Sequence, residues 1–453
     1  SGNEIAKKFV EALVAIKKLG NKNAVKVKDV QSGSTLMRIV ISIPNSVRLS
    51  EITKKNIIED IQGRIGIRHL RIQQGDSENE IYVTLPLKNR QKVLLRNYID
   101  DDRFREFSKN NYLPFLVGID EVGNPIYQCL NKARHILVAG TTGSGKSAWI
   151  NQLIITLLLN NSPKELMFYM IDIKRVELSV YKKFPHVHSI ITDANESLRL
   201  LVNLITEMDR RYKLFEDSNV KTISSYNNKN QKDKLPYIVC VIDEYAELAL
   251  RSDSVHDHVQ TLVQLSRASG IHLVIATQDP RKEVIPPIIK SNLPSKIGLR
   301  CSNVHSYQTF LNSRPSFNLL GNGDGVMAFE GQMDEYVRFQ GCLIVDDHDE
   351  NKEFELIEDL ADKINNNEFI YETTNRMDEN EDREDTEINR LKSIIAMTRE
   401  TRLSNLRDIM KINKNRLNEM LKELADEGWL ERPHAKQEGY KLILSEDELQ
   451  KWK

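Results

Sequence analysis

The chain has 453 residues, of which 40% are hydrophobic and 28% are charged, and its formal net charge is −1. A chain of this length exceeds one ordinary core, so we expect about two to four domains. The balanced charge excludes binding of nucleic acid through a global positive field, so any such surface must be local. The four cysteines lie far apart without metal-ligand spacing, which is typical of reduced thiols in a cytosolic protein.

The first 110 residues predict a small α+β domain. Residues 1–19 have the spacing of an amphipathic helix, and a second helical pattern covers residues 49–66. Three strand-like runs lie at residues 37–44, 67–74 and 80–87. This region carries no chemical motif.

From about residue 111 to 350, continuous apolar runs alternate with helical segments. The runs are residues 135–140, 166–172, 237–243, 272–277 and 295–301. Apolar strands separated by helices are typical of a parallel sheet that is covered on both faces. The sequence therefore predicts an α/β domain with a RecA-like parallel sheet at this position.

The first run leads into GTTGSGKS, which satisfies every fixed position of the P-loop pattern. Glycines let backbone N–H groups surround an anion, and the helix that follows directs its positive dipole end at the phosphates. A glycine-rich turn before an ordinary helix is the alternative, and the strand before the loop argues against it. We expect Lys146 to reach the β- and γ-phosphates of ATP and Ser147 to bind Mg²⁺. The phosphate-binding residues are Gly140, Thr141, Thr142, Gly143, Ser144, Gly145, Lys146 and Ser147.

Residues 238–242 are apolar and end in Asp243 and Glu244. Ligands of α/β sheets bind at the carboxyl ends of the strands, so both carboxylates should face the nucleotide. We expect Asp243 to complete the Mg²⁺ site and Glu244 to polarise an attacking water. An acidic strand end that begins a helix is the alternative interpretation.

Three further residues are candidates for catalysis. Gln278 follows the apolar run at 272–277, where a polar side chain can contact the γ-phosphate, although a simple strand-end cap has the same appearance. Arg267 and Arg300 could each act as an arginine finger across a subunit interface, or as an ordinary surface cation.

An acidic segment, DENEDREDTE at residues 378–387, predicts a solvated linker within residues 351–387. Helical patterns at 388–398, 403–411 and 414–427 precede a predicted β-hairpin, which together predict a winged helix over 388–453. Lys414 and Lys422 suit DNA binding, whereas Glu419 and Glu423 on the same helix leave protein docking open.

Several blocks in order resemble the FtsK/SpoIIIE family of DNA-pumping ATPases. They are RHILVAGTTGSGKSAWINQLI, MIDIKRVELSVYKKFPHVHSIITD, EMDRRYKLF, LPYIVCVIDEYAEL, RASGIHLVIATQDP and LLGNGDGVM, within residues 110–345. The resemblance implies a homohexameric ring with duplex DNA, rather than single-stranded DNA, in its channel and ATP and Mg²⁺ between subunits. It implies Glu244 as the base and Gln278 beside the γ-phosphate.

The chain also departs from the family pattern. Ile173 stands where the family has proline, Tyr307 or Gln308 replaces an expected arginine, and Asp279 interrupts the usual Gln-Arg-Pro. These departures indicate a divergent member, such as a Gram-positive coupling ATPase for conjugative transfer of a plasmid or integrative element. Chromosome segregation, protein secretion, and transcription regulation through the winged helix are the alternatives.

The resemblance further implies partners and a location. A relaxase or another transfer protein would dock on the winged helix. The chain begins Ser-Gly rather than Met, which is typical of a cleaved tag. We expect the full-length protein to be anchored in the bacterial cytoplasmic membrane by a segment that precedes this chain, with its motor portion in the cytoplasm.

Overall fold

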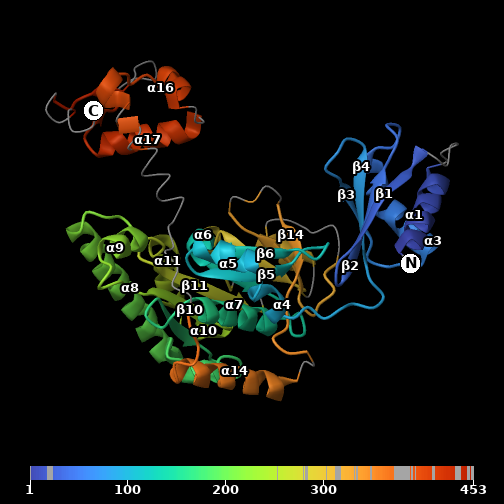
Figure 1. Cartoon of the computed structure of the whole chain (residues 1–453), viewed down its shortest axis with the longest axis horizontal. Helices are drawn as coiled ribbons and strands as arrows, with labels where there is room; N and C mark the ends of the chain where they lie inside the picture. Colours follow the sequence, from blue (N-terminus) through green and yellow to red (C-terminus); the bar gives the residue numbers. More distant parts are fainter. Residues whose placement is uncertain are drawn as a thin grey trace. The chain divides into compact units, whose positions relative to one another are not determined.

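A computed structural model of the chain divides into two compact units, residues 1–376 and 377–453. Figure 1 labels the helices and strands of the two units. The structure describes residues 2–17, 24–252, 254–278, 280, 284–301, 304–311, 318–330, 332, 335–346, 349–371, 388, 391–392, 394–410, 414–433, 440–445 and 449. No helix within these ranges is long and apolar enough to cross a membrane.

The first unit begins with an antiparallel four-stranded sheet in the order β1-β2-β4-β3. Its strands are β1 (Lys26–Ser32), β2 (Leu36–Ser42), β3 (Arg71–Gln74) and β4 (Glu80–Pro86). Helices α1 (Gly2–Ile16), α2 (Leu49–Ile52) and α3 (Lys55–Ile65) complete this part. Apolar side chains of α1, α3 and the strands form a hydrophobic core of their own.

Two sequence predictions for this part were wrong. The sheet has four strands rather than three, because β1 is an edge strand whose polar sequence, KVKDVQS, is almost entirely exposed and shows no alternation. The helix expected over 49–66 is two helices, since Thr53 ends α2 and Lys54 takes an extended conformation before α3.

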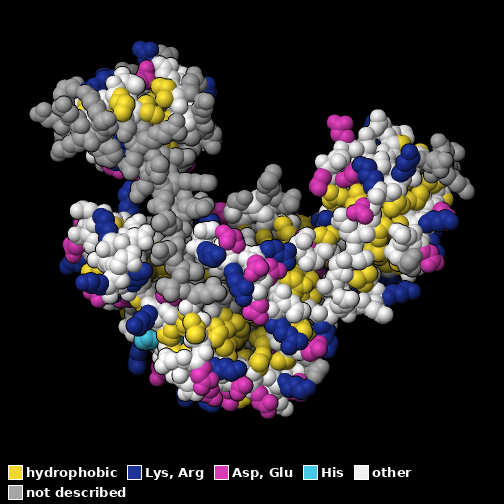
Figure 2. Space-filling model, in the orientation of Figure 1, with side chains coloured by type: hydrophobic (Ala, Val, Ile, Leu, Met, Phe, Trp, Pro, Cys, Tyr) yellow, Lys and Arg dark blue, Asp and Glu magenta, His cyan; other side chains and the backbone are white. Residues whose placement is uncertain are grey.

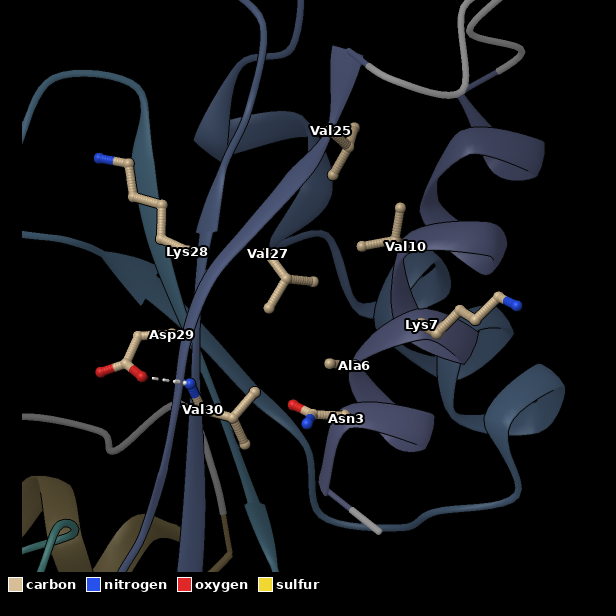
Figure 3. A pocket seen from close by; sticks show the side chains of 9 residues that line it. All are labelled: Asn3, Ala6, Lys7, Val10, Val25, Val27, Lys28, Asp29 and Val30. Carbon is tan, nitrogen blue, oxygen red and sulfur yellow. Dashed lines mark hydrogen bonds between the residues drawn. The ribbon is translucent and has the colours of Figure 1, made fainter.

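A pocket of about 640 Å³ lies between α1 and β1 (Figure 3). Hydrophobic side chains gather on this part of the chain in the space-filling view (Figure 2). The pocket is lined by Asn3, Ala6, Lys7, Val10, Val25, Val27, Lys28, Asp29 and Val30. The Asp29 carboxylate accepts a hydrogen bond from the Val30 N–H. The lining contains no residue of the P-loop.

The rest of the first unit is built on a ten-stranded sheet in the order β6-β5-β14-β13-β12-β7-β11-β10-β8-β9. Six neighbouring strands, from β12 to β9, run parallel. Five of them correspond to the predicted apolar runs, whereas β9 was not predicted. They are β7 (Ile136–Ala139), β8 (Leu166–Ile171), β9 (Val187–Ile191), β10 (Tyr237–Ile242), β11 (Ile271–Thr277) and β12 (Ser295–Leu299).

Four further strands extend the sheet in antiparallel fashion, so the wholly parallel sheet that the sequence predicts is only part of it. They are β5 (Pro114–Ile119), β6 (Pro125–Cys129), β13 (Asp324–Ala328) and β14 (Val337–Gln340). Short hairpin strands joined by tight turns give weak periodic signals, and no helix separates them.

Helices cover both faces of this sheet. The helices and the 3₁₀ helix η2 are α4 (Arg96–Ile99), α5 (Asp102–Lys109), α6 (Leu130–Ala133), α7 (Lys146–Asn160), η2 (Ser179–Lys183), α8 (Ala194–Asp217), α9 (Ile223–Lys229), α10 (Tyr245–Arg251), α11 (Ser254–Leu265), α12 (Pro287–Ser291), α13 (Val304–Leu311) and α14 (Glu350–Asn365). Alternate strand residues enter two cores: Val239 packs with α7 and α14, and Cys240 packs with α8 and α11. Burial on both faces explains why these strands are continuously apolar.

The second unit contains α16 (Leu403–Met410), α17 (Lys414–Asp426) and a short antiparallel pair, β15 (Leu430–Glu431) with β16 (Lys441–Leu442). Residues 388, 391–392 and 394–398 are helical, and the unit has its own core around Leu417 and Leu421. These elements agree with the predicted order of helices and hairpin. The acidic linker and the hairpin turn lie outside the described residues, and the winged helix itself stays a prediction.

One ion pair is buried in the antiparallel extension of the large sheet. The Arg338 guanidinium donates two hydrogen bonds to the Asp324 carboxylate, at 2.9 and 2.8 Å. The same carboxylate accepts the Leu320 N–H at 2.7 Å, and both charged side chains are almost fully buried. This pair therefore fixes the loop that precedes β13.

We expect Asp324→Ala to lower the free energy of unfolding by about 3–5 kcal/mol, because removing one member of a buried pair strands the other charge. Urea unfolding followed by circular dichroism measures the change. Glu106→Ala, which removes an exposed pair with Lys109 on α5, is the control and should cost less than about 1 kcal/mol. Equal effects of the two substitutions would contradict the structural role of Asp324.

Candidate nucleotide site

The predicted site residues meet at the carboxyl ends of neighbouring parallel strands. The P-loop follows β7, Asp243 and Glu244 follow β10, and Gln278 follows β11, which lies between those two strands in the sheet. Helix α7 begins at Lys146, directly after Gly145 in a left-handed conformation with φ 96°. One edge of the sheet thus collects residues that are separated by more than a hundred positions in the sequence.

The P-loop forms a closed cradle. The Ser144 N–H donates to the Thr141 carbonyl at 3.0 Å, and the Gly140 N–H donates to the Thr277 carbonyl at 3.2 Å. A Cβ atom at Gly140 would lie 2.5 Å from the Ser144 hydroxyl and 2.9 Å from the Leu299 Cβ, so a larger residue would displace Ser144 or Leu299. That hydroxyl is buried and has no hydrogen-bond partner. An unsatisfied buried hydroxyl at the start of a helix fits an anionic ligand such as a phosphate group.

Lys146 is buried against the strand end of β10. Its Nζ lies 3.2 Å from the Asp243 carbonyl oxygen, 3.4 Å from the Asp243 carboxylate and 3.9 Å from that of Glu244. Only 6% of Lys146 is exposed, and a buried ammonium group requires such partners. The lysine therefore points into the site where the sequence predicts the terminal phosphates.

The Asp243 carboxyl lies in a field of competing charges. Burial raises its pKa above the ordinary value, Lys146 lowers it, and the nearby carboxylates of Glu177 and Asp172 raise it again. A cation would relieve this repulsion. Among the described residues no three His, Cys, Asp or Glu side chains form a preformed metal cluster.

Glu244 is held by residues that follow two neighbouring segments of the sheet, the end of β11 and the loop after β8. Its Oε1 accepts the Thr277 hydroxyl at 3.1 Å and the Gln278 N–H at 3.2 Å, and its Oε2 lies 3.4 Å from the Lys174 Nζ. Only 4% of Glu244 is exposed, so its carboxylate is buried. Gln278 thus contributes its backbone to Glu244, while its own side chain is exposed.

The two arginines occupy different places. The Arg300 carbonyl accepts the Thr141 N–H at 3.0 Å and the Thr141 hydroxyl at 2.9 Å, so its backbone lies beside the P-loop of its own chain. Arg267 is exposed just before β11, at the opposite edge of the sheet from Thr277. The structure does not bring Arg267 to this P-loop, and a role in a neighbouring subunit stays a prediction for both.

Sequence reasoning missed two supports of the site. Residues 319–325 brace the P-loop: the Gly323 N–H donates to the Ser144 carbonyl at 2.8 Å, and a Cβ at Gly145 would lie 2.4 Å from the Gly323 nitrogen. Residues 172–178 contact Ser147 and Glu244 through Glu177 and Lys174. The block resemblance includes both segments, but neither contains a motif with a known spacing to the P-loop.

We expect Gly323→Ala to weaken nucleotide binding about tenfold. Gly323 has φ 88°, where a Cβ costs about 1–2 kcal/mol, and a shift of its backbone would move the Ser144 carbonyl. Titration with a fluorescent ATP analogue measures the dissociation constant. Gly428→Ala is the matched control, because Gly428 has φ 79° but belongs to the second unit, and it should bind the analogue as the unchanged chain does.

Residues 95–282 match the FtsK/SpoIIIE family model. The DNA translocase FtsK of Clostridium tetani is 32% identical over 431 residues, covering 93% of this chain and 57% of that protein. The DNA translocase FtsK of Clostridium acetobutylicum is 34% identical over 421 residues, covering 89% and 53%. This chain therefore spans about half the length of the curated relatives that it matches.

A solved structure gives an independent match. The pCW3 conjugation coupling protein TcpA, in its monomer form with ATPγS, superposes with a TM-score of 0.52 at 25% identity, covering 78% of this chain and 99% of that one. The matched family region contains the P-loop, both acidic residues after β10 and Gln278. The agreement of the family region, the relatives and the neighbouring structure shows that this chain belongs to the FtsK/SpoIIIE family.

Proposed function

We propose that this chain is an ATP-hydrolysing motor that moves DNA. The observation that carries the proposal is the convergence of Lys146, Asp243 and Glu244 at one sheet edge, with Lys146 within 4 Å of both carboxylates. Phosphate binding, metal binding and activation of water are the three requirements for hydrolysis of a nucleoside triphosphate. The family relatives named as DNA translocases support DNA as the substrate that is moved.

In this proposal the P-loop from Gly140 to Ser147 holds the phosphates of ATP, and Lys146 turns from Asp243 toward the β- and γ-phosphates. Ser147 and Asp243 would hold Mg²⁺, which when bound neutralises charge on the phosphate oxygens. Glu244 acts as the general base and orients the attacking water, since Thr277 and the Gln278 N–H fix one of its oxygens. The side chain of Gln278 is free to turn toward the γ-phosphate.

We further propose that six subunits form a ring and that duplex DNA runs through it. Contacts with phosphates rather than bases would make movement independent of sequence and sensitive to salt. The match to a conjugation coupling protein favours transfer of a plasmid or integrative element over chromosome segregation or protein secretion. In the transfer role, the second unit would dock a relaxase or a related protein as a winged helix.

We expect random-sequence duplex DNA to stimulate ATP hydrolysis at low salt, with the stimulation declining as salt rises. Steady-state phosphate release, measured with and without DNA, tests this. Glu244→Gln should lower the rate about 10²–10⁴-fold while nucleotide still binds, because general-base catalysis is lost. Lys146→Ala should lose both hydrolysis and tight binding. Absence of DNA stimulation in an assembled hexamer would refute the motor, and stimulation by a peptide instead would favour secretion.

The arginine that acts between subunits can be identified by mixing. An arginine finger supplies about 10³–10⁵-fold in rate, so we expect Arg267→Ala to be nearly inactive on its own. Mixed with Glu244→Gln, it should recover activity, because some interfaces then combine an intact Glu244 with an intact Arg267. Arg300→Ala is the comparison variant. If activity is recovered only when Arg300→Ala is mixed with Glu244→Gln, the arginine finger is Arg300. If neither arginine variant recovers activity in the mixture, both arginines are excluded.

A further inference from the structure

A short loop after β8, residues 172–178, contacts the two sides of the nucleotide site. At one end the Ser147 hydroxyl donates to Glu177 Oε1 at 2.8 Å. Near the other end the Lys174 Nζ lies 3.4 Å from Glu244 Oε2. Neither Glu177 nor Lys174 belongs to the P-loop or to the acidic strand end, so the proposed mechanism leaves both without a role.

The loop is held in this conformation from within. Asp172 is fully buried, and its carboxylate accepts the Leu178 N–H at 3.0 Å and the Val176 N–H at 3.4 Å. Arg175 has φ 59°, a left-handed conformation that is unfavourable for a residue with a Cβ. Backbone strain of this kind persists where the surrounding bonds fix it. The backbone of the loop therefore places Glu177 opposite Ser147.

A serine hydroxyl that binds a metal through an oxygen lone pair must direct its proton away from the metal. That proton needs an acceptor, and a carboxylate is the strongest one that a protein offers. Glu177 is the acceptor that the structure provides.

We propose that Glu177 is a positioning residue for the metal: it accepts the Ser147 proton and thereby turns the hydroxyl lone pair toward Mg²⁺. The inference rests on the proposed nucleotide function. Outer carboxylates of this kind orient the direct ligand and increase its basicity, and their loss typically weakens metal binding about 10–100-fold. Lys174, on the same loop, pairs with Glu244 instead and does not neutralise this interaction.

The test measures metal binding rather than turnover. Mn²⁺ is titrated into the full chain with ADP bound, and free Mn²⁺ is followed by electron paramagnetic resonance. We expect Glu177→Ala to raise the Mn²⁺ dissociation constant at least about tenfold. Glu177→Gln should lie between that variant and the unchanged chain, because a neutral acceptor forms a weaker hydrogen bond. ADP affinity in EDTA should change less than about twofold in both variants.

The structure offers a matched control on the same helix. Asn151 lies one turn after Ser147 on α7, and its amide donates to Glu353 Oε1, also at 2.8 Å. Glu353→Gln removes a charge at a similar hydrogen bond without touching Ser147, so it should leave Mn²⁺ affinity unchanged. Thermal unfolding of all variants checks that the loop still folds.

Three results would overturn the inference. Unchanged Mn²⁺ affinity in a folded Glu177→Ala protein would exclude the positioning role. Equal weakening of ADP binding in EDTA would show that Glu177 only maintains the shape of the site. An equal loss of Mn²⁺ affinity in Glu353→Gln would show that removal of any nearby negative charge weakens metal binding. If the unchanged chain fails to bind ADP at all, the proposed function itself fails, which is a distinguishable outcome.

Discussion

The structure depends on a buried positive charge. Lys146 begins α7 with almost no access to solvent, and its ammonium group is stabilised by the strand end that carries Asp243 and Glu244. A charge can be buried in this way only where opposite charges are already in place. The P-loop, β7 and β10 must therefore be assembled correctly before the lysine can be accommodated, and β11, which separates the two strands, supplies Thr277 to hold Glu244.

The family assignment relates the ion pairs around Asp243 and Glu244 to nucleotide chemistry. Lys146 and Lys174 neutralise the neighbouring carboxylates of Asp243 and Glu244, which would otherwise repel each other. In the proposed function, the phosphates of ATP would compete for Lys146 and a metal ion would compete for Asp243. Binding of the nucleotide would then exchange one set of charge pairs for another. Such an exchange would let Glu244 and Ser147 move without unfolding of the strands that carry them.

The sequence predicted the parts that local chemistry determines. The P-loop, Asp243, Glu244 and the buried parallel strands all have strong signals, because each requires particular residues in consecutive positions. It did not predict the edge strand β1, whose side chains are mostly exposed, or the antiparallel strands β5, β6, β13 and β14. Nor could it assign Glu177 or Gly323, since their contacts with the P-loop join segments about 30 and 180 residues away through tertiary packing alone.

The brace behind the P-loop bears on what the smallest working fragment can be. The family match ends at residue 282, and by then every nucleotide-binding motif has appeared. Yet β12, which pairs with β7, and Gly323, which supports Ser144, both come later, and the loop containing Gly323 is fixed by Arg338 from β14. A polypeptide that ends after the last motif would keep every predicted nucleotide-binding residue. It would lose β12 and the loop containing Gly323, which support the P-loop. The P-loop of this chain is therefore supported by residues as late in the sequence as β14.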